Sequence, residues 1–268
     1  MSYSTHSKAD VFLQIHEVAA RFVGHLGELD ALRDISFNVR RGEFVCLIGP
    51  SGCGKSTLLR IVAGLIQPNA GEVVLEQERR TAPSHDVGLV FQQPTLLPWR
   101  TVKGNIALPL EMRRRPERDI HERVAELLEL VGLSHFGDEY PANLSGGMAQ
   151  RAAIARALAQ NPEVLLLDEP FGALDALTRE YMAFELLRIW EQTQRTVLMV
   201  THSVEEAALL ADRVVVLSPR PGRVVDIVSV ELPRPRSPSM LETMALQNVA
   251  RRLRASLSIG TGATNLAV

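Results

Sequence analysis

The stretch Gly49-Pro50-Ser51-Gly52-Cys53-Gly54-Lys55-Ser56 decides how this chain folds. An apolar run over residues 43–48 precedes it and predicts a buried strand, and residues 57–63 follow with helical spacing that stops at Gly64. The pattern G-x-x-x-x-G-K-S between a strand and a helix is the phosphate-binding P-loop, and the motif is informative only in that context. A glycine-rich turn that arose by chance is the alternative, and the flanking segments count against it.

The chemistry of this loop follows from its residue types. Glycines allow backbone N–H groups to turn inward and approach phosphate oxygens closely, and the N-terminus of the next helix adds unpaired donors and a partial positive charge. Lys55 can reach the β- and γ-phosphates, and the hydroxyl of Ser56 can bind Mg²⁺. The predicted nucleotide-binding residues of the loop are Gly49, Pro50, Ser51, Gly52, Cys53, Gly54, Lys55, Ser56 and Thr57.

A second acidic element lies downstream, in Val164-Leu165-Leu166-Leu167-Asp168-Glu169. Its aliphatic residues predict a central strand, and ligands of open α/β sheets bind beyond the carboxyl ends of such strands. Asp168 suits Mg²⁺, a hard cation that prefers oxygen ligands, and Glu169 can polarise the water that attacks a γ-phosphate. Two solvated loop acids are the alternative for an Asp-Glu pair by itself, and the upstream P-loop favours the functional interpretation.

Composition narrows the classes of protein that the chain can represent. It has 268 residues, of which 46% are hydrophobic and 22% charged, as in ordinary globular proteins. The formal net charge of −2 provides no global basic field for nucleic acid, so we expect no nucleic-acid partner. The polar N-terminus lacks a signal-peptide core, and no apolar run is long enough to span a bilayer. Cys46 is expected to be a small core residue.

The rest of the pattern predicts an α/β fold. Residues 10–48 have the pattern of antiparallel strands that include the P-loop strand, with a turn at Arg41-Gly42. Residues 95–160 are expected to be mostly helical, and a tail from Pro233 is expected to be a peripheral appendage. One helix in the helical part has an apolar face made of Ile120, Val124, Leu127, Leu128 and Val131. Strands and helices then alternate, which indicates a parallel sheet covered by helices. The predicted strands of that sheet and its flanks are 71–75, 87–91, 164–168, 196–200 and 214–217, and the predicted helices are 177–192 and 203–211.

A second glycine-rich loop narrows the family. Leu144-Ser145-Gly146-Gly147-Met148 opens an alanine-rich helix predicted over residues 149–159, so it is a second candidate anion site at a helix N-terminus. Between a P-loop and an acidic strand end, this element makes the chain resemble the ATP-binding subunit of ABC transporters over residues 11–230. The family signature is usually L-S-G-G-Q, so Met148 departs from it, whereas Ser145 and both glycines are present.

The resemblance implies further site residues. Gln92 matches the Q-loop glutamine, which in the family senses Mg²⁺ and the membrane partner, and Asp175 matches the D-loop. His202 matches the switch histidine at the end of a strand. Phe22 is the candidate for the aromatic residue that stacks on adenine, and a core position in the N-terminal strands is its alternative. The metal-site residues implied are Ser56, Gln92 and Asp168, and the signature residues that act in trans are Ser145, Gly146, Gly147 and Met148.

The resemblance also implies an assembly. The fold would be a P-loop NTPase with a parallel core sheet, an N-terminal antiparallel β subdomain and an inserted helical subdomain at about 95–160. The ATP-binding domain would span 10–232, with a C-terminal extension at 233–268. Two copies would form a head-to-tail homodimer that hydrolyses ATP with Mg²⁺ at the cytoplasmic face of the inner membrane. This dimer would drive transmembrane permease subunits, which dock near the Q-loop.

Three segments resemble the importers of nitrate, aliphatic sulfonates and taurine. They are residues 96–102, residues 218–224 and the Ser-Gly-Gly-Met variant of the signature. Such importers also use a periplasmic or lipid-anchored substrate-binding protein. Other importer subfamilies, and a soluble ABC ATPase of DNA repair, chromosome organisation or translation, remain alternatives. A long coiled coil or a second ATPase cassette would be expected in those soluble types, and the sequence has neither. A P-loop kinase would lack the Ser145-Gly146-Gly147 element.

Two features remain open from sequence. Cys53 lies among inward-facing N–H groups near Lys55, a setting that favours thiolate, so it is either a reactive handle on the nucleotide site or an inert thiol. The run Arg113-Arg114-Arg115 can contact a phosphate or an acidic partner, but a solvated loop is the more common form of such a run.

Overall fold

A six-stranded, mostly parallel sheet forms the centre of the computed structural model, which describes residues 11–24 and 27–260. The polar N-terminus and the last part of the predicted C-terminal extension lie outside the described residues. The strand order is β10-β9-β3-β8-β7-β6, with every neighbouring pair parallel except β10 and β9. The strands are β3 (Phe44–Ile48), β6 (Val87–Val90), β7 (Val164–Asp168), β8 (Thr196–Val200), β9 (Arg213–Leu217) and β10 (Val224–Ser229). The expected α/β fold class is confirmed.

Burial on both faces explains why the central strands read as continuous apolar runs. Every residue of β3, β7 and β8 is buried, as expected for parallel strands covered on both sides. Helices α1 (Lys55–Val62), α5 (Ala176–Thr193) and α6 (Val204–Leu210) follow β3, β7 and β8 in the chain. Because these strands are parallel, their carboxyl ends lie at one edge of the sheet. The P-loop and Asp168 therefore meet at that edge.

A second, antiparallel sheet packs over the first. Its order is β2-β1-β4-β5, and its strands are β1 (Val11–Gly24), β2 (Gly27–Arg40), β4 (Ala70–Leu75) and β5 (Glu78–Arg79). Buried residues of this sheet, of α1 and of one face of the parallel sheet form one hydrophobic cluster. A second cluster covers the opposite face and includes residues of α5, α6 and the helical region.

The prediction that β3 continues the antiparallel strands is wrong. The turn at Arg41-Gly42 is present, and Gly42 has a φ of +73°, but the chain then enters the other sheet. β2 alternates buried and exposed positions toward its end, which suits a sheet with one face toward solvent. β3 is buried at all five positions and pairs in parallel with β8 and β9. The absence of alternation in residues 44–48 is the sequence signal that β3 belongs to the parallel sheet.

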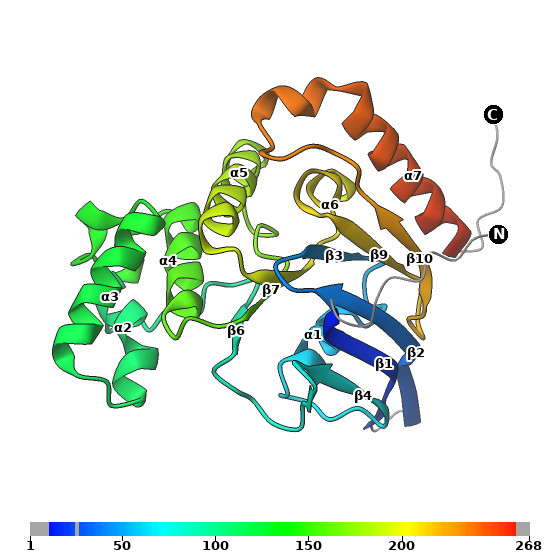
Figure 1. Cartoon of the computed structure of the whole chain (residues 1–268), viewed down its shortest axis with the longest axis horizontal. Coiled ribbons are helices and arrows are strands. Elements are labelled where there is room, and N and C mark those ends of the chain that lie inside the picture. The colour runs from blue at the N-terminus through cyan, green and yellow to red at the C-terminus, as the bar shows by residue number, and fades with distance from the viewer. Residues whose placement is uncertain (1–10, 25–26, 261–268) are drawn as a thin grey trace.

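Three helices form an arm beside the sheets, seen at the left of Figure 1. They are α2 (Val102–Met112), α3 (Glu117–Leu130) and α4 (Gly146–Leu158), with short 3₁₀ turns at Ser134–Phe136 and Pro141–Asn143. The five residues of the predicted apolar face of α3 are all buried, which confirms that expectation. These helices fall within residues 95–160, and the subdomain boundaries themselves stay a prediction.

The C-terminal segment packs more closely than the expected appendage. After β10, which the sequence did not predict, a 3₁₀ turn (Pro238–Glu242) leads to α7 (Met244–Gly260), which lies along α6 and β10 in Figure 1. Leu246, Ala250 and Leu253 of α7 are buried in the main cluster. The Arg236 guanidinium donates to the carbonyls of Leu209 and Ala211 at the end of α6, and burial lowers the pKa of Arg236 to about 10.

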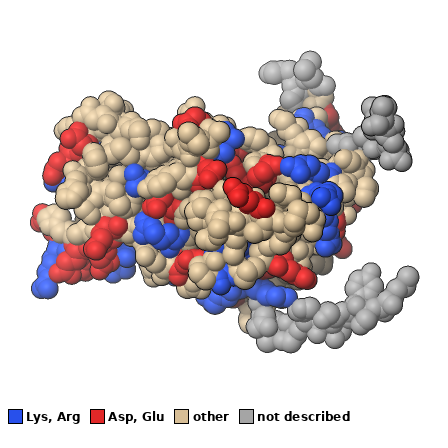
Figure 2. Space-filling view, turned by 90° about the horizontal axis from the view of Figure 1, so that it is seen from above, with Lys and Arg blue, Asp and Glu red and all other residues tan. Residues whose placement is uncertain are grey.

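Acidic and basic side chains are interspersed over the face shown in Figure 2. No helix in the described part of the chain combines the length and the apolar character needed to cross a bilayer.

If the C-terminal segment is part of the core, shortening the side chain of Leu253 will destabilise the protein. Leu253→Ala should lower the free energy of unfolding by about 2–5 kcal/mol, because it opens a cavity beneath α7. Urea denaturation measures this change. Arg252→Ala is the control on the exposed face of the same helix, and it should change the free energy by less than about 0.5 kcal/mol. Equal effects of the two substitutions would contradict the packing of α7.

Candidate nucleotide site

The P-loop runs from the end of β3 to the start of α1. Gly54 caps α1 with a φ of +105°, and a β-carbon at this position would lie 2.6 Å from Leu32 Cδ2 and 2.9 Å from the carbonyl oxygen of Ala31. Only glycine fits both the left-handed backbone and this close approach. The helix begins at Lys55, two residues earlier than predicted, so Lys55 and Ser56 lie in its first turn.

Two side chains of α1 point to the carboxyl edge of the sheet. The Lys55 ammonium donates to the carbonyl oxygens of Gly49 (2.8 Å) and Pro50 (3.0 Å), so it lies across the P-loop. The Ser56 hydroxyl donates to Asp168 Oδ1 at 2.8 Å. Ser56 and Asp168 come from segments more than a hundred positions apart in the chain, and this hydrogen bond joins the two predicted motifs.

Asp168 and Glu169 occupy different environments at the end of β7. Asp168 is 8% exposed, and burial raises the pKa of its carboxyl while the Ser56 hydrogen bond opposes that rise. Glu169 has a φ of +46°, and its N–H donates to the carbonyl of Val200 on the neighbouring strand. Glu169 Oε2 lies 3.2 Å from His202 Nδ1, so the predicted water-polarising residue and the predicted switch histidine are in contact.

A pocket of about 260 Å³ brings the P-loop, Glu169 and the N-terminal strands together. It is lined by Phe22, Leu29, Ala31, Ser51, Gly52, Gly54, Lys55, Ser56, Thr57, Glu169 and Arg220. Phe22 lies on β1 opposite Leu29 of β2 and is 40% exposed, so the interpretation of Phe22 as a core residue is wrong. Its ring borders the pocket, and its stacking on adenine stays a prediction.

Of the two alternatives for Cys53, the structure favours the inert thiol. The side chain is 1% exposed, and burial raises the pKa of its thiol, although Lys55 opposes the effect. The sulfur lies beneath the loop, since a β-carbon on Gly49 would be 2.9 Å from Cys53 Sγ. The contribution of Cys53 to a phosphate site is therefore limited to its backbone. Cys46 is buried in β3, as expected.

The Q-loop residue Gln92 lies close to Glu169 and not in the pocket itself. A β-carbon on Gly172 would be 3.0 Å from Gln92 Nε2 and 3.5 Å from Glu169 Oε2, so both side chains border Gly172. Gln92 is exposed and does not line the pocket. Its predicted contact with a metal stays a prediction.

The signature loop opens α4, three residues before the predicted helix start. Ser145 is its N-cap, and its hydroxyl accepts a hydrogen bond from the Met148 N–H at 3.3 Å. Ser145 and Gly146 are exposed, whereas Gly147 is buried against α5. None of the signature residues lines the pocket around this chain's own P-loop, within the part of the chain described. Asp175 caps α5 and accepts a hydrogen bond from the Thr178 N–H, which lowers the pKa of its carboxyl.

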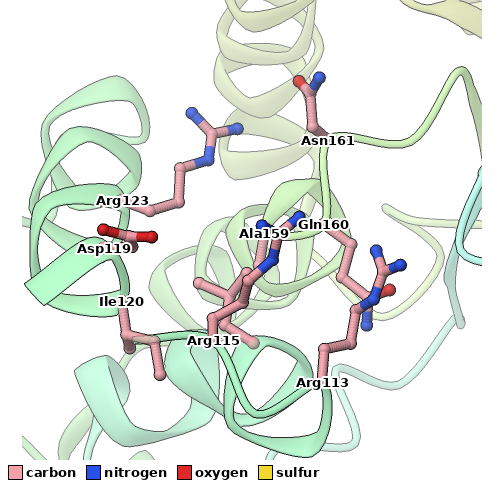
Figure 3. A pocket seen from close by; sticks show the side chains of 9 residues that line it. Arg113, Arg115, Asp119, Ile120, Arg123, Ala159, Gln160 and Asn161 are labelled. Carbon is pink, nitrogen blue, oxygen red and sulfur yellow. The ribbon is translucent and has the colours of Figure 1, made fainter. Parts of the chain in front are cut away.

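The arginine run lies on the arm, away from the residues that line the nucleotide pocket. Arg113, Arg114 and Arg115 are exposed, as expected for a solvated loop. Arg113, Arg115, Asp119 and Arg123 line a separate pocket of about 400 Å³, which Figure 3 shows. The residue that sequence reasoning missed is Arg220, which reaches the nucleotide pocket from the turn before β10. The motif S-P-R-P-G-R supports only a subfamily likeness from sequence, and its proline and glycine indicate a tight turn.

Comparisons with known proteins agree with this geometry. Residues 32–172 match the family model described as ABC transporter. An aliphatic sulfonates import ATP-binding protein of Bacillus cereus is 47% identical over 225 residues, which are 84% of this chain and 88% of that protein. A nitrate import ATP-binding protein of Synechocystis is 47% identical over 82% of this chain and 83% of that protein. A taurine import ATP-binding protein of Roseobacter denitrificans is 47% identical over 79% of this chain and 80% of that protein.

Solved structures of the same kind share the fold. The dimeric structure of an ATP-binding cassette in a post-hydrolysis state, bound to ADP and Pi, has a TM-score of 0.71 and 33% identity to this chain. The match covers 82% of this chain and 100% of that chain.

The buried carboxylate predicts a dependence of stability on pH. The pKa of Asp168 is higher in the folded state than in the unfolded state, where it is about 3.9. Ionisation of Asp168 therefore lowers the stability of the folded protein at pH values above the folded-state pKa. This loss of stability disappears as the pH falls toward the unfolded-state pKa. In EDTA and without nucleotide, Asp168→Asn should therefore melt at a higher temperature than the wild type at pH 7, and the difference should shrink toward pH 4. Melting curves across this pH range measure the effect. Asp138→Asn is the exposed control, and a lower melting temperature for Asp168→Asn at pH 7 would contradict the prediction.

Proposed function

The chain belongs to the ABC transporter family, and on that premise we propose that it is the ATP-hydrolysing subunit of an importer, with nitrate, aliphatic sulfonates or taurine as the substrate class. One observation carries the proposal. The P-loop, the Ser56–Asp168 hydrogen bond and Glu169 converge at one pocket at the carboxyl edge of the sheet. The substrate class rests on the likeness to the named importers, since transported substrate would not touch this chain.

The residues at the pocket fit a nucleotide with its magnesium ion. The P-loop would cradle the phosphates with its backbone N–H groups, and Lys55 would move from the loop carbonyls to phosphate oxygens. Asp168 and Ser56 offer the hard oxygen donors that Mg²⁺ prefers. When bound there, Mg²⁺ would neutralise charge on the phosphates. Phe22 borders the same pocket and is our candidate for the adenine platform.

Glu169 and His202 are the proposed catalytic pair. Glu169 reaches the pocket and can accept a proton from, or orient, the water that attacks the γ-phosphate. The His202 contact at 3.2 Å holds the Glu169 carboxylate in place. His202 stands directly before Ser203, the N-cap of α6. A shift of that helix would therefore move His202 and, through their contact, the Glu169 carboxylate.

The signature loop would act on the nucleotide of a second copy. Ser145 and Gly146 are exposed at the N-terminus of α4 and do not line their own pocket, which leaves their N–H groups free for a partner's phosphates. The dimeric state of the solved cassette supports a homodimer of this kind. A cross-link that joins Ser145 to Lys55 of the same chain would contradict the arrangement.

Transport requires a membrane partner. The segment after Gln92 exposes Trp99 (71%) beside the arm, and we propose that permease subunits dock on this part of the helical region. The chain would then lie at the cytoplasmic face of the inner membrane, and a periplasmic or lipid-anchored binding protein would deliver substrate to the permease. We also propose an ATP-binding domain over 10–232, with the helical subdomain at about 95–160 and an extension from 233.

Glu169→Gln tests the catalytic assignment. The substitution keeps the shape of the side chain and removes the charge that polarises water. Turnover of ATP should fall by at least about a hundredfold, while the dissociation constant for ATP stays near the wild-type value. Steady-state hydrolysis and equilibrium binding measure the two quantities on the same preparation. Glu205→Gln is the control, an exposed acid paired with Arg254, and it should hydrolyse ATP normally. Near-normal hydrolysis by Glu169→Gln would remove the residue from the mechanism.

Copurification tests the transport assignment. The tagged full-length chain, expressed in its own cells and extracted in detergent, should bring down a multispanning membrane protein in a stable complex. Mass spectrometry identifies that partner, and the reconstituted complex should hydrolyse ATP faster with the substrate-binding protein present. Recovery of the chain with DNA-repair, chromosome or ribosomal components would instead support a soluble ABC ATPase.

A further inference from the structure

The turn before β10 lies against the outer side of the P-loop. The turn comprises residues 218–223, and its Gly222 exchanges two backbone hydrogen bonds of 2.9 Å with β2, one to the Ala31 carbonyl and one from the Arg33 N–H. A β-carbon on Gly222 would lie 2.2 Å from the carbonyl oxygen of Cys53. The turn is therefore fixed to β2 and contacts the P-loop backbone directly.

Arg220 extends from this turn to one P-loop atom. Its Nε and Nη2 donate to the carbonyl oxygen of Gly52 at 2.9 and 2.6 Å. Arg220 lines the nucleotide pocket together with Phe22 and Gly52, and it has no acidic partner among the described residues. Arg223, on the same turn, instead pairs with Asp34 at 3.8 Å and does not line the nucleotide pocket.

The captured carbonyl sets the direction of the next N–H group. In a planar trans peptide, the C=O and the N–H point to opposite sides. The Gly52 oxygen points to Arg220, so the Cys53 N–H points to the opposite side of this peptide, where it donates to the Pro50 carbonyl at 3.3 Å. Gly52 has a φ of +74°, and glycine imposes little resistance to rotation of this peptide. Arg220 supplies the restraint that glycine lacks.

We propose that Arg220 is a positioning residue of the nucleotide site. Its guanidinium fixes the orientation of the Gly52–Cys53 peptide by holding the Gly52 carbonyl oxygen, which keeps that oxygen from turning toward the phosphates. The charge of Arg220 also raises the positive potential at the rim of the pocket. The inference rests on the proposed function, because the ligand is the triphosphate or diphosphate of a nucleotide. It adds a residue outside the P-loop to the phosphate site. Both contributions act on bound nucleotide before and during hydrolysis, so they raise affinity and leave the chemical step unchanged.

The experiment compares Arg220→Gln, Arg220→Lys and Arg223→Gln in the full-length chain. Calorimetry gives the dissociation constants for ATP and ADP, and thermal denaturation without nucleotide gives the melting temperature. Arg220→Gln should weaken the binding of both nucleotides by about tenfold or more, since it loses charge-assisted hydrogen bonds and a positive charge. Arg220→Lys keeps the charge and one donor, so its affinity should lie between those of Arg220→Gln and the wild type. Arg223→Gln should bind as the wild type does.

Three further results separate positioning from a structural role. Without nucleotide, the melting temperatures of Arg220→Gln and Arg223→Gln should differ by no more than about 2 °C. The contact that Arg220→Gln removes lies at the surface, where substitutions change stability little. The KM for ATP should rise while kcat at saturating ATP stays within about twofold. Wild-type affinity in Arg220→Gln, or a loss of affinity matched by a loss of apo stability that Arg220→Lys does not restore, would overturn the inference. Failure of the wild type to bind ATP would reject the proposed function itself.

Discussion

The position of β3 between two parallel neighbours is the constraint on which the site depends. β3 pairs with β8 on one side and β9 on the other, so its carboxyl end cannot shift without breaking both ladders. The residue that follows is the first of the P-loop, and β7, beyond β8, ends at the same edge with Asp168. The Ser56–Asp168 hydrogen bond is a product of that alignment. The two carboxylates and the loop are therefore positioned by sheet register, and their own contacts refine that placement.

Close backbone approach is the second constraint, and it concentrates around the P-loop. β2 approaches the loop at Gly54, and the 218–223 turn approaches it at Cys53. Both contacts require glycine on at least one side, because a β-carbon would overlap a neighbouring atom. The P-loop is thus covered by β2 of the antiparallel sheet and by the turn before β10, the edge strand of the parallel sheet. This arrangement leaves its inner side for a ligand and ties its outer side to distant parts of the chain.

Local patterns predicted the elements that depend on local chemistry. The P-loop, the aliphatic strand before Asp168 and the apolar face of α3 can all be read from spacing, and the structure places each of them as expected. The predictions failed where the environment of a residue depends on segments that are distant in the sequence. Cys53 is two positions before Lys55 in the chain, yet its thiol is buried. Arg220 and Gly52 are far apart in sequence, and no local pattern predicts their contact. β3 lies in the parallel sheet and not in the predicted antiparallel one, because it is buried on both faces in the assembled fold.

The short helix α6 is stabilised by its contacts with the C-terminal segment. A helix of two turns does not last in water by itself, because nucleation is costly and few hydrogen bonds offset it. The Arg236 guanidinium donates to the Leu209 and Ala211 carbonyls at the end of α6, and α7 packs along the helix. The amide protons of α6 should therefore exchange with solvent only when the C-terminal segment opens, and on its timescale. His202 stands one residue before Ser203, the N-cap of this helix, so the rigidity of the His202 side chain depends on residues that lie beyond the sheet.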